Sequence, residues 1–309
     1  MTRTLNCTYI NRPIGPLADD VANARRLLGM TDESIRRDVR ELRQWLNDEP
    51  DLPNTFEGVD TDWWLENYLT INKNQVDRAK ANLRVYFQLR NLIPEVMGNR
   101  NPETDRYMIQ TYNSVLISLV PTIMDKSRKL VIFKHRADVP ASNYHPVAVV
   151  KQSICIGEIL FAEGFDHTSC VIVFDLGTFR LNHLVRYPIG LLRRFFFYVW
   201  KAYPERVAQI HIINPPNILS AVMALFKPFL KSKIRKRIIV HQNFESLLEH
   251  VPLKYLPKDY GGESLSLIEL HEQWRQKVID YQPYLNICLD RQRNVGQNKN
   301  TSDSSGSNN

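Results

Sequence analysis

Apolar residues recur every three or four positions in three successive runs in the first third of the chain, a period typical of amphipathic helices. The first run begins after Thr31, the second after Asp60 or Thr61, and the third after Asn74. Thr, Asp and Asn side chains commonly cap helix N-termini, so these residues are the expected caps. We therefore predict a small all-helical lobe over residues 31–97.

After residue 98 the pattern changes to short, nearly continuous apolar runs that alternate with longer helical stripes. Strands separated by helices favour a sheet with substantial parallel pairing and helices packed on it. The expected strands are 130–133, 170–176, 207–213 and 237–241, and the expected helices are 146–164, 187–203, 218–230 and 264–284.

These patterns divide the chain into four regions. Residues 1–30 carry little pattern and are expected to be irregular, and the helical lobe (31–97) follows them. An α/β domain that ends in a helix is expected over 98–285. The polar, low-complexity residues 286–309 predict a disordered tail.

The helix expected at 218–230 differs from the others because it is apolar most of the way round. One stripe along it consists of Leu219, Val222, Met223, Phe226 and Leu230. We expect the Asn-Pro-Pro sequence at 214–216 to open this helix, since proline is tolerated in a first turn. Such a helix is buried on two sides, or is buried on one side and faces lipid on the other.

Six cations follow within eleven residues, at the end of this helix and just after it: Lys227, Lys231, Lys233, Arg235, Lys236 and Arg237. The whole chain has a formal net charge of +7, which favours acidic partners. The cations are not interleaved with exposed aromatic residues, so we expect no nucleic-acid partner. An apolar helix that ends in a cationic cluster suits the surface of an anionic membrane.

The composition is that of a soluble globular protein, with 43% of its 309 residues hydrophobic and 24% charged. The four cysteines lie far apart without a CxxC motif, which favours a reducing compartment. No secretory signal is visible, and the most apolar short run, 195–200, is far shorter than the roughly 20 residues that span a bilayer. We expect a monomeric cytoplasmic protein that is at most transiently membrane-associated.

The sequence contains no GxSxG, no GxGxxG after a strand, no Walker loop and no HExxH. A metal or base role is open for His211 and His241, but spacing places no third ligand, so structural histidines are the commoner interpretation. Asp175 could be a catalytic carboxylate, although a buried, hydrogen-bonded Asp is more common. We predict that the protein is not an enzyme and binds neither a metal nor a cofactor.

Four long segments, in this order, resemble successive signatures of the CRAL-TRIO lipid-binding domain: VIVFDLGTFRLNHL (171–184), AYPERVAQIHIINPPNIL (202–219), LFKPFLKSKIRKRIIVH (225–241) and LPKDYGGE (256–263). The segments ELRQWL (41–46) and WWLENYLTINKNQVDRAKANL (63–83) resemble the small helical domain that usually precedes it. The resemblance covers roughly residues 30–280 and is strongest to the branch of tocopherol and retinaldehyde carriers.

This resemblance implies a mixed, largely parallel sheet that forms the floor of a lipid pocket, with helix 218–230 as a movable gate. It also implies that basic residues beside the gate bind phosphoinositide head groups, and the matching positions here are Arg206, Lys233 and Arg237. Ala208 stands where the family has a further basic residue, and NYLTIN (67–72) replaces its arginine-rich segment. Lys227, Lys231, Arg235 and Lys236 are the other cations available to an anionic surface.

For the pocket wall the sequence suggests residues of two strands, of helix 187–203 and of the gate. The candidates are Ile172, Phe174, Leu176, Phe195, Tyr198, Val199, Ile210, Ile212, Leu219, Val222, Met223 and Phe226. Plain core packing is an equal alternative for each of them. Alternate residues of a strand face opposite sides, and the pattern does not say which side holds a cavity.

Two functions follow from the pattern and the resemblance together. The first is a soluble carrier that binds one small lipophile, tocopherol-like or retinoid-like, and exchanges it at anionic, phosphoinositide-containing membranes. The alternative is a phosphoinositide- or lipid-sensing interaction module without bulk transfer activity. A bound lipid that moves between vesicles favours the carrier.

Overall fold

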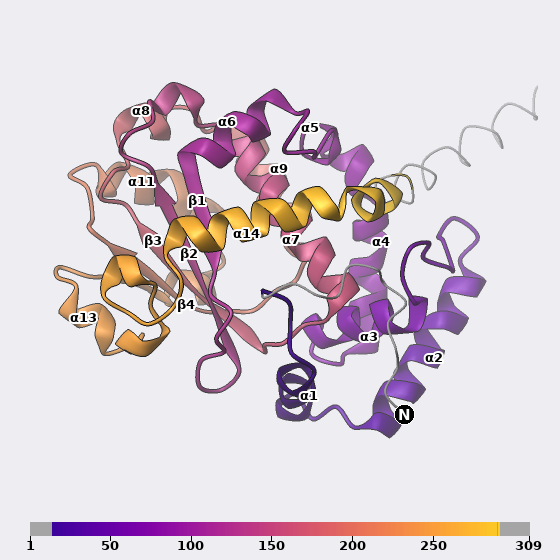
Figure 1. The fold of residues 1–309 in the computed structure, drawn as a ribbon. Helices are drawn as coiled ribbons and strands as arrows, with labels where there is room; N and C mark the ends of the chain where they lie inside the picture. Colours follow the sequence, from indigo (N-terminus) through magenta and orange to yellow (C-terminus); the bar gives the residue numbers. More distant parts are fainter. Residues whose placement is uncertain (1–13, 289, 291–309) are drawn as a thin grey trace, which may run out of the picture.

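The computed structural model describes residues 14–288 and 290. Its N-terminal part is helical and consists of α1 (Ala18–Leu27), α2 (Asp32–Asp48), α3 (Thr61–Ile71), α4 (Val76–Leu92) and the short α5 (Pro94–Met97). These helices lie together on one side of the molecule, beside the sheet (Figure 1). The helical region expected before the sheet is therefore confirmed.

Local side-chain chemistry sets where these helices begin. The Thr31 hydroxyl accepts a hydrogen bond from the Ser34 N–H at 3.1 Å, and the Ser34 hydroxyl accepts one from the Thr31 N–H at 2.9 Å. Asp60 caps α3 by accepting from two backbone N–H groups of its first turn. These two predicted caps are confirmed. The third is wrong by one residue, because Gln75 precedes α4 and Asn74 has a left-handed φ of 53°.

Helix α1 lies within residues 1–30, so the prediction of an irregular segment there is wrong. Its buried residues are only Val21 and Ala24, which are too few to show a helical stripe in the sequence. Arg25 fixes it by donating to a carboxylate and an amide of α3 at 3.0 and 3.1 Å. Such a tertiary contact leaves no periodic trace. Residues 1–13 lie outside the described part of the chain.

Five strands form one sheet in the order β1 (Val115–Leu119), β2 (Arg128–His135), β3 (Ser169–Asp175), β4 (Val207–Ile213) and β5 (Ile238–Val240). Strand β1 runs antiparallel to β2, and the other neighbours are parallel. The predicted α/β fold with a mixed, largely parallel sheet is confirmed. The pattern does not predict β1, because this strand directly follows α6 (Arg106–Ser114) without turn residues.

Helices connect the parallel strands. The 3-10 turn η1 (Ala141–Asn143) and helix α7 (Pro146–Glu163) lead from β2 to β3, and Gly164 ends α7 with φ 131°. After α8 (Leu181–Leu184), the expected helix at 187–203 consists of α9 (Ile189–Arg194), the π-helical turn η2 (Phe195–Val199) and α10 (Trp200–Ala202). The prediction of one regular helix there is thus correct in place and wrong in detail.

The helix expected at 218–230 is also shorter than predicted. It consists of α11 (Leu219–Phe226) and the 3-10 turn η3 (Lys227–Phe229), and a separate α12 (Ser232–Arg235) follows. The Asn-Pro-Pro sequence at 214–216 lies before α11 and not in its first turn, so that expectation is wrong. Asn214 instead turns the chain out of β4 with φ 50°, and its side chain donates to Asp175 at 2.9 Å.

Short elements follow β5: α13 (Glu245–Leu248), the 3-10 turns η4 (Leu253–Tyr255) and η5 (Lys258–Tyr260), and then the long α14 (Leu267–Asp280). Residues 282–288 are also helical, so the prediction of a disordered tail is wrong for residues 286–288. Residues 289 and 291–309 lie outside the described part of the chain.

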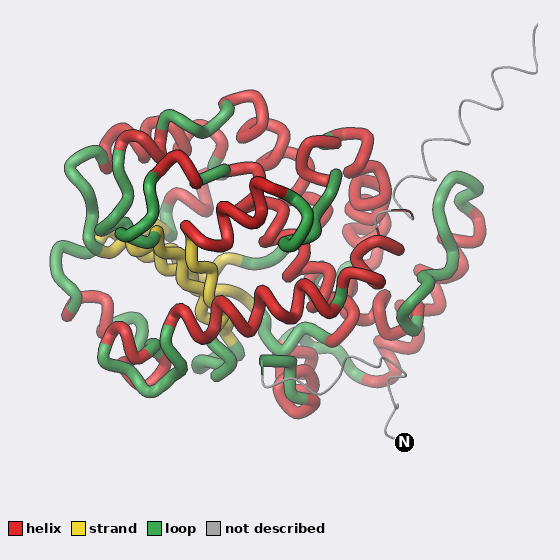
Figure 2. Tube along the Cα trace, turned by 45° about the horizontal axis from the view of Figure 1, so that its top comes forward, coloured by secondary structure: helices red, strands yellow, loops and turns green. Residues whose placement is uncertain are grey.

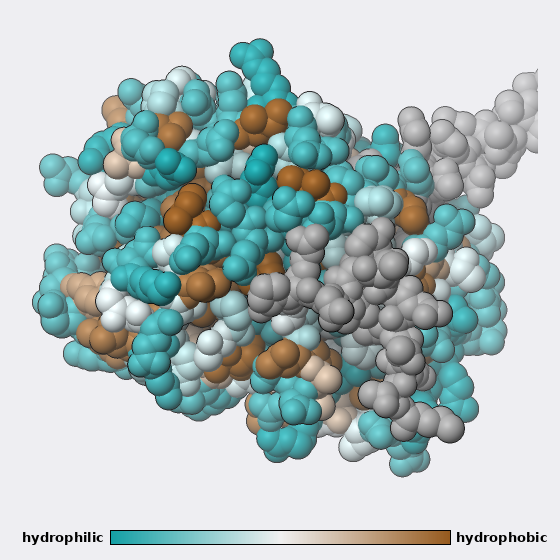
Figure 3. All heavy atoms as spheres, viewed as in Figure 1, coloured by the Kyte–Doolittle hydropathy of each residue, from teal (hydrophilic) through white to brown (hydrophobic). Residues whose placement is uncertain are grey.

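The two faces of the sheet are covered differently. One face carries Leu130, Ile132, Val171 and Val173, which are fully buried beneath side chains of the segment 244–270. The opposite face meets the helices that come before β3 and after β4, and Figure 2 shows the strands enclosed between helical segments. Helix α14 crosses in front of the sheet in Figure 1. Figure 3 shows the same side of the molecule, on which α14 lies. Among the described residues visible there, hydrophilic side chains predominate and apolar ones form small separate groups.

The helical lobe and the sheet domain share one apolar core. The ring of Trp64 in α3 lies against Phe161 of α7, with centroids 5.0 Å apart. The hydroxyls of Tyr86 in α4 and Tyr203 after α10 both donate to the buried carboxylate of Glu158, at 3.0 and 2.5 Å. These contacts fix the lobe against α7 and the start of β4, so its side chains have defined positions beside the sheet.

Candidate functional site

Apolar side chains on one face of the sheet line up in two rows, which together we call the inner face. One row consists of Val131, Ile172, Ile210 and Ile238, and the other of Phe133, Phe174, Ile212 and Val240. Residues two apart on a strand point to the same side, so both rows share one face. The structure therefore brings the predicted strand residues together there, and Leu176 continues the alternation of β3.

The inner face is less buried than the face behind it. Ile172 and Phe174 are half-buried and Val240 is 37% exposed, whereas Val171 and Val173 on the reverse face are fully buried. The accessible part of the inner face lies on β2, β3 and β5, because Ile210 and Ile212 of β4 are only 8% and 5% exposed. Accessible apolar surface gains about 25 cal/mol for each Å² that a ligand covers. The inner face thus has the accessibility expected of a binding wall.

Helix α11 covers part of this wall. Its residues Leu219, Val222, Met223 and Phe226 form one cluster with Phe174, Leu176 and Ile212. The ring of Phe226 meets the ring of Tyr187 edge-on, with centroids 5.0 Å apart. The candidate residues of α11 and of the sheet therefore lie together.

The remaining pocket candidates lie in the π-helical turn. Phe195 and Tyr198 are half-buried and pack, like Val131 and Phe133 of β2, against the large core, and Val199 is 6% exposed. Turns of this kind recur at functional sites. These candidates do not belong to the α11 cluster, so the structure divides the predicted wall into two groups.

Sequence reasoning missed Val131 and Phe133, although they alternate with the buried Leu130 and Ile132 in the pattern of a strand whose two faces differ. It also missed Tyr187 and Leu184, which pack with the α11 cluster. These two lie outside regular strands and long helices, so no periodic signal marks them.

Polar side chains gather at the carboxyl end of β2, in what we call the His135 corner: His135, Tyr144, His183 and Tyr187. The His135 ring lies 4.8 Å from each of the rings of Tyr144 and His183, centroid to centroid. The hydroxyls of Tyr144 and Tyr187 hydrogen-bond to each other. The Nε2 atom of His135 is buried and has no hydrogen-bond partner among the described residues. Burial, reinforced by His183, lowers the pKa of His135 to about 3, so the ring is neutral at pH 7.

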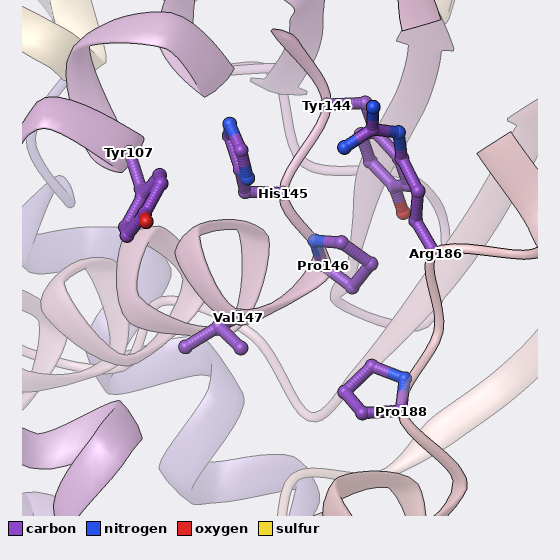
Figure 4. A pocket seen from close by; sticks show the side chains of 7 residues that line it. All are labelled: Tyr107, Tyr144, His145, Pro146, Val147, Arg186 and Pro188. Carbon is purple, nitrogen blue, oxygen red and sulfur yellow. The ribbon is translucent and has the colours of Figure 1, made fainter. Parts of the chain in front are cut away.

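A surface pocket of about 360 Å³ adjoins this corner through Tyr144 (Figure 4). It lies between α6, the start of α7 and the segment before α9, and is lined by Tyr107, Tyr144, His145, Pro146, Val147, Arg186 and Pro188. His145 lies against the Tyr107 ring at 4.4 Å, and its Nε2 is 2.7 Å from Oε1 of Gln110. None of the predicted pocket residues lines it.

The predicted cations occupy two kinds of position. Lys227, Lys231, Lys233, Arg235 and Lys236 are exposed, whereas Arg206 and Arg237 are half-buried. Arg237 donates to the backbone carbonyl of Val207, and Arg235 donates to the carbonyl of Leu230 at 3.2 Å. Among the described residues, none of the predicted cations forms an ion pair with a carboxylate.

Two further cations reach this cluster from the helical lobe. The pKa of Lys73 is lowered first by burial and then by the positive charges of Arg206, Arg78, Lys233 and Arg237. Burial and the charges of Arg78 and Arg237 likewise lower the pKa of Arg206. We call these five side chains the cationic face. Like charges are brought together there, which makes the electrostatic potential of this surface positive.

The sequence did not point to Lys73 or Arg78, because the segment that matches the family's arginine-rich stretch, 67–72, holds no cation. Lys73 lies just after α3 with a left-handed φ of 62°, and Arg78 lies in the first turn of α4. The lobe thus contributes charge from the next turn of the chain. The positions of Lys73 and Arg78 beside the predicted cations follow from tertiary packing and cannot be read from the spacing of residues in the sequence.

Comparison with known proteins agrees with the fold. Residues 117–262 match the CRAL/TRIO domain, and residues 31–107 match a model described as a Pinta-like UBA domain. Residues 117–262 of this chain form a CRAL-TRIO domain. The chain is 28% identical over 247 residues to the alpha-tocopherol transfer protein-like protein of Homo sapiens. This alignment covers 79% of this chain and 70% of that protein.

The chain is also 24% identical over 260 residues to clavesin-1 of Rattus norvegicus, and the alignment covers 82% of this chain and 71% of that protein. Among solved structures, the crystal structure of Sfh5 aligns with a TM-score of 0.42 and 14% identity, over 81% of this chain and 91% of that one. No helix within the described residues is long and apolar enough to cross a membrane.

Proposed function

We propose that this protein is a carrier that binds one small lipophile against the inner face and exchanges it at anionic membranes through movement of α11. The single observation that supports this proposal is the partly accessible apolar inner face, which lies against the short apolar helix α11. The similarity to an alpha-tocopherol transfer protein-like protein supports the same class of ligand.

The energetics require a gate. A ligand that buries about ten CH₂ groups gains roughly 8 kcal/mol, which corresponds to a dissociation constant near 1 μM. The same free energy opposes escape into water, so release needs an apolar acceptor such as a bilayer. Helix α11 suits this role because it has eight residues and its inward contacts are apolar. Contacts with lipid can replace these contacts at little net cost.

The ends of α11 suit a hinge. The left-handed Asn214 and the two prolines precede it, and a 3-10 turn that contains Pro228 follows it. Neither segment continues α11 as a regular α-helix. In the segment that packs on α11 through Leu184 and Tyr187, Leu181 of α8, Val185 just after it and Ile189 of α9 are 54%, 70% and 64% exposed, and would offer apolar contacts to a membrane.

The His135 corner is the proposed site for the polar end of the ligand. His135 follows Val131 and Phe133 on the inner-face side of β2, and its unpaired Nε2 would pair with a hydroxyl or carbonyl. A buried nitrogen that gains a hydrogen bond contributes about 1 kcal/mol. The ligand class is therefore a lipophile with one polar end rather than a pure hydrocarbon.

The cationic face is the proposed head-group site. Each cation near an anionic surface contributes about 1 kcal/mol of binding, and polyphosphorylated head groups concentrate several negative charges within reach of one such cluster. Because the five cations come from the lobe, from α12 and from the residues just before β4 and β5, head-group binding would fasten the protein close to α11. The exposed Lys227, Lys231, Arg235 and Lys236 would add attraction without head-group selectivity.

The test combines ligand loading with transfer between vesicles. Phe226→Asp places a charge on the inner side of α11 and is expected to abolish loading. Ala224→Asp, on the exposed side of the same helix, is expected to keep the ligand and slow its delivery. If the purified chain holds no lipid and moves none, while it still binds anionic vesicles, the protein is an interaction module and the carrier proposal fails.

A further inference from the structure

A second cluster of polar side chains lies at the amino ends of β3 and β4. His167 lies two residues before β3, Cys170 is the second residue of that strand, and Glu205 lies two residues before β4. One ligand atom from each residue, the His nitrogen, the Cys sulfur and a carboxylate oxygen, lies within 4.8 Å of the other two. His167 and Cys170 are each 4% exposed. The carrier function described above uses none of these residues.

The separations suit a tetrahedral metal ion. Zn²⁺ binds sulfur at about 2.3 Å and nitrogen or oxygen at about 2.0–2.2 Å, so its ligand atoms lie about 3.3–3.6 Å apart. The Cys170 sulfur and the Nε2 of His167 are 3.8 Å apart. The Glu205 carboxylate is closer, at 2.7 Å from that Nε2, and hydrogen-bonds with the thiol. Only Glu205 must move outward, and its side chain is 40% exposed, so it has room to turn.

A second layer of side chains orients the imidazole. Nδ1 of His167 donates to Asp166 at 2.7 Å, and Asp166 in turn accepts from Lys129 at 2.6 Å. The side chains of Lys129 and Asp166 are 6% and 4% exposed. A carboxylate behind a histidine is the usual support of a zinc ligand, because it fixes the ring and directs the other nitrogen toward the ion. Here that nitrogen points toward Cys170 and Glu205.

The charges also balance. Both ring nitrogens of His167 face carboxylate oxygens, so the ring carries two protons, and Cys170 donates its thiol proton to Glu205. When a divalent ion binds, the Nε2 proton and the thiol proton leave to solvent, and the sulfur and nitrogen lone pairs form the new bonds. Two positive charges replace two protons. The buried group, with Lys129 and Asp166 included, keeps the same total charge, which avoids the cost of burying an uncompensated ion.

We propose that His167, Cys170 and Glu205 bind one Zn²⁺ ion per chain, with water as the fourth ligand on the side where Glu205 is accessible. A thiolate and an imidazole select zinc over magnesium and calcium, which prefer oxygen ligands. The site would tie the loop before β3 to the loop before β4. It adjoins the backbone carbonyl of Arg206, which accepts from the Cys170 N–H at 2.7 Å, so the ion would also fix one end of the cationic face.

The experiment uses the full chain, depleted of metal with a chelator and titrated with Co²⁺ as a spectroscopic substitute and then with Zn²⁺. We expect one ion per chain and a charge-transfer band from thiolate to Co²⁺. Cys170→Ser should abolish this band and weaken Zn²⁺ binding at least about 100-fold. Cys155→Ser removes another buried thiol, in α7, and should leave band and affinity unchanged. Asp166→Asn should weaken binding about 10- to 100-fold.

Glu205→Gln is the second variant, for the case that Cys170→Ser fails to fold. The Glu205 side chain is partly exposed, and the substitution replaces only one carboxylate oxygen by an amide nitrogen, so this variant should fold. It should lower Zn²⁺ affinity while the near-ultraviolet circular dichroism of the apo chain stays that of the wild type. X-ray absorption at the zinc edge should show one sulfur and the rest nitrogen or oxygen. The proposal is overturned if the wild-type chain binds less than one tenth of an equivalent of either ion, or if the charge-transfer band survives in Cys170→Ser.

Discussion

Removing two charges from the cationic face should weaken membrane binding without emptying the ligand site. The double substitution Lys73→Ala and Lys233→Ala takes one cation from the lobe and one from α12. Neither forms an ion pair with a carboxylate among the described residues, and neither belongs to an apolar cluster. Each cation contributes about 1 kcal/mol at an anionic surface, so the pair contributes about 2 kcal/mol. Vesicle affinity should therefore fall about 30-fold.

The assay is co-sedimentation with vesicles that contain phosphoinositide or phosphatidylserine, at two salt concentrations. Lys254→Ala is the matched control, because Lys254 is an exposed lysine of the segment 244–270, which covers the reverse face of the sheet. It removes the same charge and should lower affinity much less. The difference between the variants should shrink as salt rises, since the screening length falls to about 10 Å at 0.1 M.

Three outcomes would refute this reasoning about the cationic face. Equal weakening in Lys254→Ala would mean that net charge alone matters. No weakening in the double variant would mean that the five clustered cations do not contact the membrane. Loss of ligand loading along with vesicle binding would show that Lys73 and Lys233 support the fold. Stronger weakening with phosphoinositide than with phosphatidylserine would assign head-group selectivity to this face.

Other predictions separate the two faces of the sheet and the His135 corner. Leu130→Ala, in the fully buried reverse face, should lower the free energy of unfolding by about 2–5 kcal/mol and leave ligand affinity nearly intact. Phe174→Ala, in the inner face, should lower the free energy of unfolding less and ligand affinity more. Urea unfolding and ligand titration measure the two effects, and the reverse order would contradict the assignment of the faces. The pKa of His135 is about 3 in the fold and 6.5 when unfolded, so the unfolded chain binds more protons between these values and stability is lost as pH falls from 6.5 toward 3. His135→Phe should flatten this part of the pH profile in urea unfolding, and an unchanged slope between pH 6.5 and 4.5 would show that His135 is accessible.

Local chemistry made part of the fold predictable. The caps Thr31 and Asp60 act within a few residues of themselves, and the apolar runs of β3 and β4 are continuous enough to identify. Strand β1 and helix α1 were missed for the opposite reason. The first continues from a helix without a turn, and the second is held by the side chain of Arg25 across a long sequence separation.

The candidate site was predictable as a set of residues but not as an arrangement. The sequence names Ile172 and Phe174, and only the strand register shows that they share a face with Ile210 and Ile212. Lys73 approaches Arg206 because the lobe packs on α7 and α10, and no spacing rule encodes that approach. In the same way, Glu205 meets His167 and Cys170 only because β3 and β4 are neighbours.

Native mass spectrometry of the purified wild-type chain tests whether the inner face holds a lipophile. We expect one lipophilic molecule with a single polar end bound per chain, which leaves the chain during incubation with anionic vesicles and appears in those vesicles. A chain that carries no lipid before or after incubation, even when purified with excess candidate lipophiles, would contradict the claim that the inner face is a ligand-binding wall.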